Sequence, residues 1–321
     1  MKNALLTLTL LFTTYGVTTA QYLPKQLFVV ATSLKLRAEP GLQSNVLASM
    51  SNGEPVELIE DKADEETRLY DQVEGIRGRW LKIRYKDKTG FAFSPYLAPR
   101  YSLFYEHSHT DYLPKVNHWY GVYRKKNGEE EIREIKVRQC RIPENDVEEE
   151  HQYLCTDQRD TSLFVIATNE VIRPGYAGVF SQRYGENSGI SLDIKPGTEC
   201  WLFWKLKGNT IDGQHFQLYG TGTYSMQSAG LQLTNYQVMV AQRKSPGSEF
   251  RALQDLTPFF SYIDSYVKVV WVGDLDRDDK PDLILQSCST QSCTNYLFLS
   301  SEAGEQELLR CISSYSWYDE C

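Results

Sequence analysis

The chain has 321 residues, which is long for one compact domain and predicts about two. Hydrophobic residues make up 41% and charged residues 24%, a balance that excludes a largely disordered or collagen-like protein. Asp and Glu number 42 against 34 Lys and Arg, giving a formal net charge of −8. This balance argues against a nucleic-acid partner, because phosphate binding depends on clustered Lys and Arg. The 12% aromatic content favours β structure.

The first twenty residues have the three parts of a secretory signal. Lys2 is their only charged residue, residues 4–12 are largely apolar, and the segment ends in Thr18, Thr19 and Ala20. The apolar run is shorter than the roughly 20 residues that span a bilayer. We therefore expect residues 1–20 to be removed, leaving a periplasmic or secreted protein that does not span the membrane.

Residues 27–99 predict a series of short strands. Apolar or alternating segments, separated by turn residues such as Asn52 and Gly53, cover residues 27–30, 34–37, 46–50, 56–59, 80–85 and 91–93. No helical period interrupts them. The expected structure is a small β-barrel or sandwich at the N-terminal end of the mature chain.

This region resembles the bacterial SH3 family. The resemblance lies in residues 34–40, Gly53 before Val56, residues 80–83, and residues 89–91 with Tyr96 and Leu97. The charged stretch 61–78 departs from it, because the family has a shorter turn there. The resemblance implies an SH3-like barrel that docks peptides or cell-wall stem peptides on an aromatic-lined cleft.

The tyrosines of this region are the expected ligand-binding residues, since exposed aromatic rings beside polar loops stack on extended chains. They are Tyr70, Tyr85 and Tyr96. Trp80, Phe91 and Phe93 are expected to fill the barrel, together with Leu36 and Val56.

All seven cysteines follow residue 139, which in an exported protein predicts disulfide bonds confined to the C-terminal part. Proximity along the chain suggests three pairs and leaves Cys200 alone, although sequence alone leaves other connectivities open. The suggested pairs are Cys140–Cys155, Cys288–Cys293 and Cys311–Cys321. The spacings do not suit zinc. The asymmetry indicates two structural units that are stabilised in different ways.

Residues 101–321 predict a larger β domain, either a sandwich or an irregular barrel. Strand-like segments separated by turns cover residues 132–138, 162–167, 190–194, 201–206, 216–221 and 236–240. Residues 302–311 are the best helix candidate. The fold class is therefore mainly β, with an SH3-like barrel followed by this domain.

Two polar features of this region are best interpreted as surface positions without a specific role. His107, His109 and His118 include a His-x-His pair, but a metal site would need a further ligand at a recognisable spacing, so we expect surface or linker positions. The acidic runs 129–131 and 144–150 predict solvated loops. The alternative is an acidic face for a basic partner.

The sharpest motif is the acidic loop 274–282, which is flanked by the apolar segments 269–272 and 283–285. Its carboxylates stand at loop positions one, three, five and nine, which turns alternate oxygens inward toward a hard cation. The expected ligands are Asp274, Asp276, Asp278 and Asp282 with the carbonyl of Lys280.

The loop looks like the calcium loops of integrin-type β-propeller repeats, although a single copy argues against a propeller. It is not an EF-hand, because Leu285 stands where an EF-hand has Glu. Asp279 replaces the glycine of position six, where positive φ is often required. We expect a structural calcium ion, and the alternative is an acidic turn that folds without metal.

Catalytic motifs are scarce: the sequence has no Gly-x-Ser-x-Gly, no His-Glu-x-x-His and no glycine-rich phosphate loop. The one candidate nucleophile for catalysis is Cys200, with His215 downstream. Residues 201–204 read as a strand, whereas catalytic thiols favour helix starts, so we do not expect an enzyme.

The leading hypothesis is a non-catalytic cell-envelope protein that recognises peptidoglycan stem peptides or a protein partner. One alternative is a periplasmic immunity or inhibitor protein against a toxin or cell-wall enzyme. The other is a cysteine-dependent cell-wall peptidase or amidase.

Overall fold

The computed structural model describes residues 26–59, 70–73, 75–108, 113–141, 152–178, 192–197, 199–202, 205–206, 209–210, 215–227, 230–243, 249–260, 263, 265–290 and 292–318. These residues form strands, loops and two short 3-10 helices, so the predicted mainly-β class is confirmed. The predicted signal, residues 1–20, lies outside them. No helix in the described part of the chain is long and apolar enough to cross a membrane.

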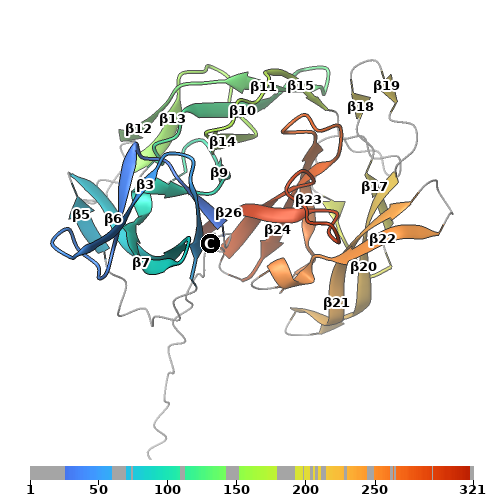
Figure 1. Ribbon diagram of the computed structural model, residues 1–321. Coiled ribbons are helices and arrows are strands. Elements are labelled where there is room, and N and C mark those ends of the chain that lie inside the picture. The colour runs from blue at the N-terminus through green and yellow to red at the C-terminus, as the bar shows by residue number, and fades with distance from the viewer. Residues whose placement is uncertain are drawn as a thin grey trace, which may run out of the picture.

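The N-terminal region is a β-barrel with strand order β3-β2-β7-β6-β4-β1-β8, and β5 pairs with the first half of β6 (Figure 1, left). All six predicted strands are present, and β5 and β8 are additional. The strands are β1 (Gln26–Val29), β2 (Ser33–Arg37), β3 (Val46–Ser51), β4 (Pro55–Leu58), β5 (Tyr70–Val73), β6 (Ile76–Tyr85), β7 (Lys88–Phe93) and β8 (Leu97–Ala98).

Alternation along the strands fills this barrel. In β2 the side chains of Leu34 and Leu36 are buried while Lys35 between them is exposed. Val56 and Ile83 join them in one cluster, as expected for Leu36 and Val56. Each fully buried aliphatic side chain contributes roughly 1.5–3 kcal/mol of transfer free energy, so this cluster holds the barrel together without a disulfide.

A second, smaller cluster lies under β5. Trp80 and Phe93 are buried and Phe91 is partly buried, as predicted, and Val73 of β5 packs with them. The indole nitrogen of Trp80 donates to Asp71 Oδ2 at 3.1 Å. Strand β5, which lies within the charged stretch 61–78 that departs from the family, thus covers the tryptophan.

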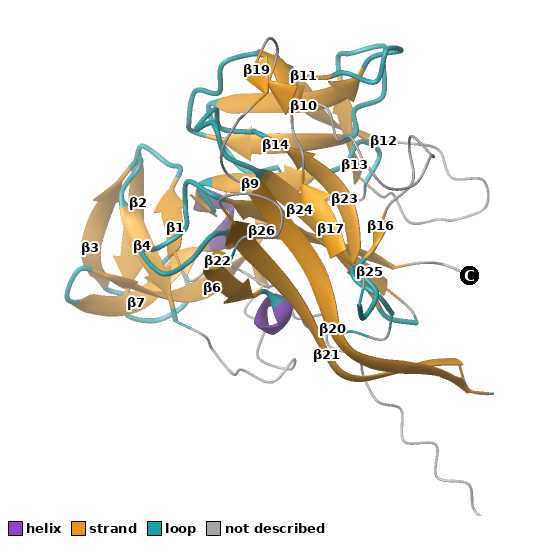
Figure 2. Cartoon of the chain, turned by 90° about the vertical axis from the view of Figure 1, so that its right-hand side faces the viewer, coloured by secondary structure: helices purple, strands orange, loops and turns teal. Residues whose placement is uncertain are grey.

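The larger β region is built on one central sheet that is buried on both faces. This sheet has the order β16-β23-β24-β25-β26, and its partners are the sheets β15-β11-β10-β14-β9 and β17-β20-β21-β22 (Figures 1 and 2). In β24, Leu283 and Leu285 join one core cluster while Ile284 between them joins the other. Both neighbours therefore pack on the central sheet, and its inner strands contain continuous apolar runs at residues 269–272 and 283–285.

The strands of this region are β9 (Tyr101–Phe104), β10 (His118–Arg124), β11 (Glu130–Glu134), β12 (Val137–Arg141), β13 (Gln152–Thr156), β14 (Phe164–Thr168), β15 (Gly175–Gly178), β16 (Leu192–Asp193), β17 (Glu199–Leu202), β18 (Lys205–Leu206), β19 (Asn209–Thr210), β20 (His215–Gln227), β21 (Gly230–Arg243), β22 (Phe250–Asp255), β23 (Lys268–Gly273), β24 (Asp282–Cys288), β25 (Ser292–Leu299) and β26 (Arg310–Tyr318). Strands β12–β13 and β18–β19 form separate pairs.

The helix predicted over residues 302–311 is wrong: turns and irregular backbone occupy residues 301–309, and β26 begins at Arg310. Gln254 of β22 explains the difference. Its side chain accepts from the backbone nitrogens of Leu308 and Leu309 and donates to the Leu309 carbonyl at 2.7 Å. Tertiary bonds thus take the backbone groups that a helix would use.

Two of the three predicted disulfide bonds are confirmed. Cys140–Cys155 joins β12 to β13, and Cys288–Cys293 joins β24 to β25. The third is corrected, because the Cys311 thiol is free, buried in the core and directed at the Ser313 carbonyl. Cys321 lies outside the described residues.

Candidate functional site

The three tyrosines expected to bind a ligand do not form one exposed cleft. Tyr85 is 6% exposed, and its hydroxyl donates to Glu54 Oε1 at 2.6 Å. Tyr96 packs against Phe93 and lies beneath the ammonium group of Lys115. The side chain of Tyr70 lies outside the described residues. Tyr85 is therefore a core residue, contrary to the prediction, because it shares the inward face of β6 with Ile83.

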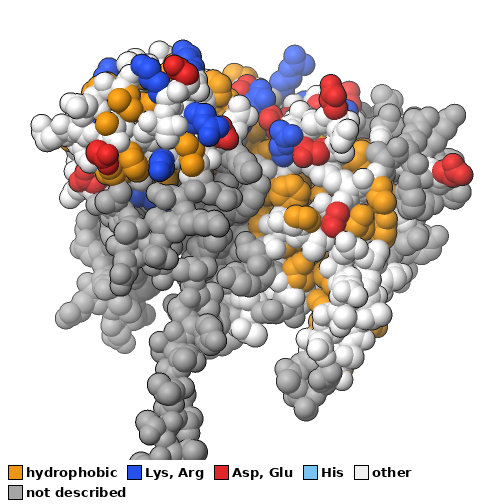
Figure 3. Space-filling view, turned by 60° about the horizontal axis from the view of Figure 1, so that its bottom comes forward, with side chains coloured by type: hydrophobic (Ala, Val, Ile, Leu, Met, Phe, Trp, Pro, Cys, Tyr) orange, Lys and Arg blue, Asp and Glu red, His pale blue; other side chains and the backbone are white. Residues whose placement is uncertain are grey.

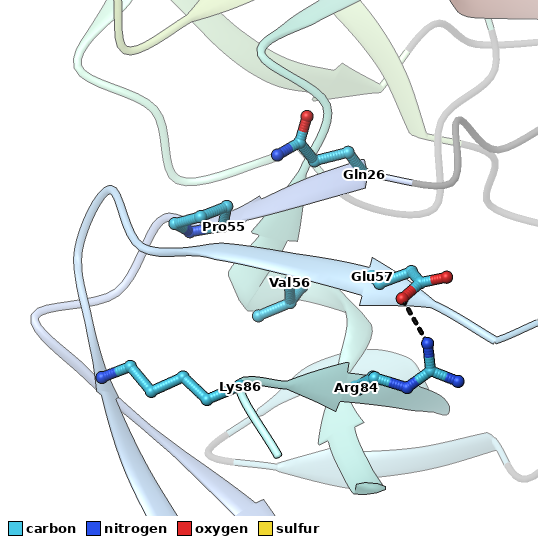
Figure 4. A pocket seen from close by; sticks show the side chains of 6 residues that line it. All are labelled: Gln26, Pro55, Val56, Glu57, Arg84 and Lys86. Carbon is cyan, nitrogen blue, oxygen red and sulfur yellow. Dashed lines mark hydrogen bonds and ion pairs between the residues drawn. The ribbon is translucent and has the colours of Figure 1, made fainter. Parts of the chain in front are cut away.

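The barrel surface instead offers a hollow with charges of both signs. Lys, Arg, Asp and Glu side chains are mixed over this lobe (Figure 3, left). The hollow has a volume of about 380 Å³ and opens across β1, β4 and the end of β6 (Figure 4). Its lining residues are Gln26, Pro55, Val56, Glu57, Arg84 and Lys86.

Opposite charges pair around this hollow. Arg84 Nη1 lies 2.7 Å from Glu57 Oε2, and both side chains are about half exposed. Lys86 reaches Glu54 at 3.4 Å and covers the ring of Tyr85. The pKa of Glu54 is lowered, mainly by the hydrogen bond from the Ser51 backbone. The pKa of Lys86 is raised, mainly by its interaction with the Tyr85 hydroxyl. The hollow thus presents carboxylates and cations beside an apolar floor.

The acidic loop brings three of its four aspartates together. Oxygens of Asp274, Asp276 and Asp282 lie within 4.8 Å of one another, and the side chains of Asp274 and Asp282 are fully buried. Asp278 turns instead toward Ser300, whose hydroxyl lies 3.1 Å from Asp278 Oδ2. Lys280 is exposed, and its backbone nitrogen donates to Asp278 Oδ1.

Two carboxylate oxygens of this cluster have no hydrogen-bond partner in the described part of the chain. They are Asp274 Oδ2 and Asp276 Oδ1, both buried. The other oxygens are satisfied, since Asp282 accepts from the backbone nitrogens of Leu275 at 2.7 Å and Ser300 at 3.1 Å. A buried anionic oxygen without a partner is costly, so the donor set is chemically incomplete without a cation or a proton.

The pKa values of the loop aspartates also indicate that the cluster needs a cation or a proton. The pKa of Asp274 is raised to about 6, first by burial and then by its neighbours Asp276 and Asp278. Burial raises the pKa of Asp282 well above its ordinary value. Clustered carboxylates destabilise one another's charged forms, and a hard cation with oxygen ligands would remove that repulsion.

The loop backbone adopts positive φ at position six, although Asp279 replaces glycine there. Asp279, at the position where related loops have glycine, has φ of 61°, and Arg277 has φ of 69°. The Asp278 nitrogen donates to Asp274 Oδ1, which closes the turn. The aspartate therefore accepts the left-handed conformation in this loop.

Ser300 and Ser301 complete the cluster from another part of the chain. They follow β25, and the Ser301 hydroxyl donates to Asp276 while Ser300 contacts Asp278 and Asp282. Sequence reasoning missed both residues, because no spacing links them to the loop. Their proximity follows from the antiparallel pairing of β24 with β25.

The remaining polar predictions have simple outcomes. His118 bonds to Glu134 at 2.9 Å, His107 is exposed, and His109 lies outside the described residues. The run 129–131 is not a free acidic face. Glu130 is buried against Arg124 and Trp271, and Glu131 pairs with Lys125 and Arg133. The run 144–150 and the side chain of Cys200 lie outside the described residues.

Comparison with known proteins identifies a family for one part of the chain. Residues 32–98 match the bacterial SH3 domain, so the resemblance in that region is confirmed. No curated protein and no solved structure matches the chain. A bacterial SH3 domain is a module of cell-wall or protein interactions, and its combination with disulfides is typical of cell-envelope or extracellular proteins.

Proposed function

We propose that this protein is a non-catalytic binding protein of the cell envelope that recognises peptidoglycan stem peptides through its SH3 domain. The observation that carries the proposal is the hollow of the barrel, where Glu57 and Arg84 pair beside the apolar residues Pro55 and Val56. A stem peptide carries both carboxylate and amino groups on a short apolar backbone. The mixed charges and the apolar floor match that combination.

A binding assay on purified peptidoglycan tests this function. The double variant Arg84→Gln/Lys86→Gln removes both cations of the hollow, and Lys35→Gln/Lys88→Gln removes two cations outside it. We expect wild type and control to be retained and the first variant to lose at least tenfold in affinity. Retention of a protein partner such as a toxin or an envelope enzyme, with no binding to peptidoglycan, would favour a protein ligand instead.

We also propose that the acidic loop binds a calcium ion with a structural role. The support is the pair of unpartnered buried oxygens, Asp274 Oδ2 and Asp276 Oδ1, beside Asp282. Oxygen-only ligands suit calcium. The ion would neutralise the buried carboxylates and hold the β23–β24 loop to the turn after β25.

Calorimetry and thermal unfolding test the ion. At free calcium 100-fold above the dissociation constant, binding should stabilise the larger β region by about 2.7 kcal/mol. Asp276→Asn should abolish the heat of binding, and Asp160→Asn, an exposed aspartate outside the loop, should leave it unchanged. No heat with the wild-type protein would contradict the proposal.

A further inference from the structure

Strands β20 and β21 form a hairpin that is much longer than the sheet to which it belongs. They pair from His215↔Arg243 to Gln227↔Gly230. Strand β17 covers the other edge of β20 only as far as Tyr219, and Pro196 bridges Gly220. Within the described residues no strand pairs with that edge from Thr221 onward, and this outer half projects from the body (Figure 2).

Beyond its first residue pair the hairpin carries no charge. Residues 216–242 contain no Asp, Glu, Lys or Arg, in a chain of which 24% is charged. The described surface near the hairpin correspondingly shows mainly uncharged atoms (Figure 3, lower right). Exposed strand edges are normally protected from pairing by charges, prolines or covering loops. The outer half of β20 has neither charges nor prolines, which is the composition of an edge that pairs with another strand.

A bend gives the outer half an apolar face. Gly222 and Asn235 have positive φ where the register shifts. Beyond the bend, Tyr224 packs edge-on against Tyr266, and Leu233 opposite it packs on the core. Met226, on the same face, is 75% exposed and Tyr224 is 52% exposed. The core of the larger β region thus continues outward as an apolar strip that its own sheet leaves uncovered.

We propose that this arm is a self-association surface, on which the β20 edge pairs antiparallel with the β20 edge of a second copy of this chain. Charge favours this occupant, because two molecules with net charge −8 repel each other over most surfaces and least along a stretch without charges. Symmetry favours it too, since an antiparallel pair of identical strands is closed by a twofold axis.

The register makes the pairing self-complementary. If the twofold axis passes through Ser225, Met226 of each copy lies opposite Tyr224 of the other. In an antiparallel pair, residues at equal distances before and after the axis face each other. The thioether then contacts the aromatic ring, a favourable pairing. A four-stranded sheet, β21-β20-β20-β21, would result across the two molecules.

Analytical ultracentrifugation of the full mature chain over a concentration series tests the proposal. Wild type should form a discrete dimer that dissociates on dilution. Met226→Glu and Ser225→Lys should each weaken the dimer at least tenfold. Val171→Glu is the matched control, because Val171 is also 75% exposed and lies outside the hairpin, and it should leave the dimer unchanged. Thermal unfolding verifies that every variant is folded.

Three outcomes would overturn the proposal. The first is a wild-type protein that stays monomeric at about 100 µM. The second is a dimer that Met226→Glu does not weaken. The third is open-ended aggregation without a discrete dimer. Binding of monomeric wild type to phosphatidylcholine vesicles, lost in Met226→Glu, would identify a lipid surface as the occupant instead. None of these measurements depends on the peptidoglycan assay.

Discussion

The barrel and the larger β region reach a stable β structure by different means. The barrel has no cysteine, and its inward side chains alternate with exposed ones, as in β2. The larger region buries both faces of its central sheet, holds two disulfide bonds among its described residues, and encloses aspartates at one end of that sheet. The barrel relies on apolar burial without a disulfide bond, whereas the larger region adds covalent bonds and buries a cluster of carboxylates.

Truncation of the core should have the largest effect and should separate the two regions. Ile83→Ala in the barrel and Ile284→Ala in the central sheet each remove a fully buried side chain. Each should lower the free energy of unfolding of its own region by about 2–5 kcal/mol. Calorimetric unfolding should show two transitions, with one shifted in each variant. A single transition that both variants shift equally would contradict independent regions.

Loss of the longer disulfide should come next. The Cys140–Cys155 bond closes a loop with a sequence separation of 15 residues. Its removal in the double variant Cys140→Ser/Cys155→Ser should cost about 3 kcal/mol, because the unfolded chain gains conformational entropy. Urea unfolding should detect the loss in the larger region only. A reducing agent should leave the barrel transition unmoved, since the barrel has no cysteine.

The metal-free loop should give the larger region an unusual pH dependence. The folded-state pKa of Asp274 is about 6 against an ordinary value of 3.8, so the folded protein holds this proton more tightly than the unfolded chain. With a chelator present, the tighter binding of this proton adds to the free energy of unfolding. The added stability is complete below about pH 4 and is lost as the pH rises through about 6. Unfolding measured across that range should show it, and Asp274→Asn should flatten the slope.

The smallest effect on stability is expected at the hollow of the barrel. The Arg84–Glu57 pair is about half exposed on both sides. Arg84→Gln should therefore change the free energy of unfolding by at most about 1 kcal/mol. If the same variant weakens retention on peptidoglycan, the loss belongs to binding and not to folding. A large fall in the barrel's unfolding temperature would show that the pair has a structural role.

Sequence patterns predicted the barrel better than the rest. The alternation seen in β2 also occurs at the end of β6, where it places Tyr85 inward beside Ile83. The prediction of a binding role overlooked this signal. Strand β5 escaped prediction because its neighbourhood is charged. The continuous apolar run 283–285 predicted a strand, yet it could not indicate that two other sheets cover it.

The candidate cation site was predicted in part. The spacing of Asp274, Asp276 and Asp282 along one loop was sufficient to indicate that they converge. Ser300 and Ser301 reach the loop only through strand pairing, so no local pattern could reveal them. The false helix at residues 302–311 has the same origin, because Gln254 binds that backbone from a distant strand.

The contact between the first and last strands of the larger region, which belong to different sheets, has a consequence for synthesis. Strand β9 directly follows the barrel, and the Leu103 nitrogen donates to Ser313 of β26 at 3.0 Å. The barrel is complete once residue 98 has emerged from the ribosome. The core beneath β9, in contrast, lacks one of its packing strands until β26 has been synthesised. A nascent chain that stops before Arg310 would therefore present a finished barrel followed by some two hundred unfolded, apolar-rich residues, a substrate for chaperones and proteases.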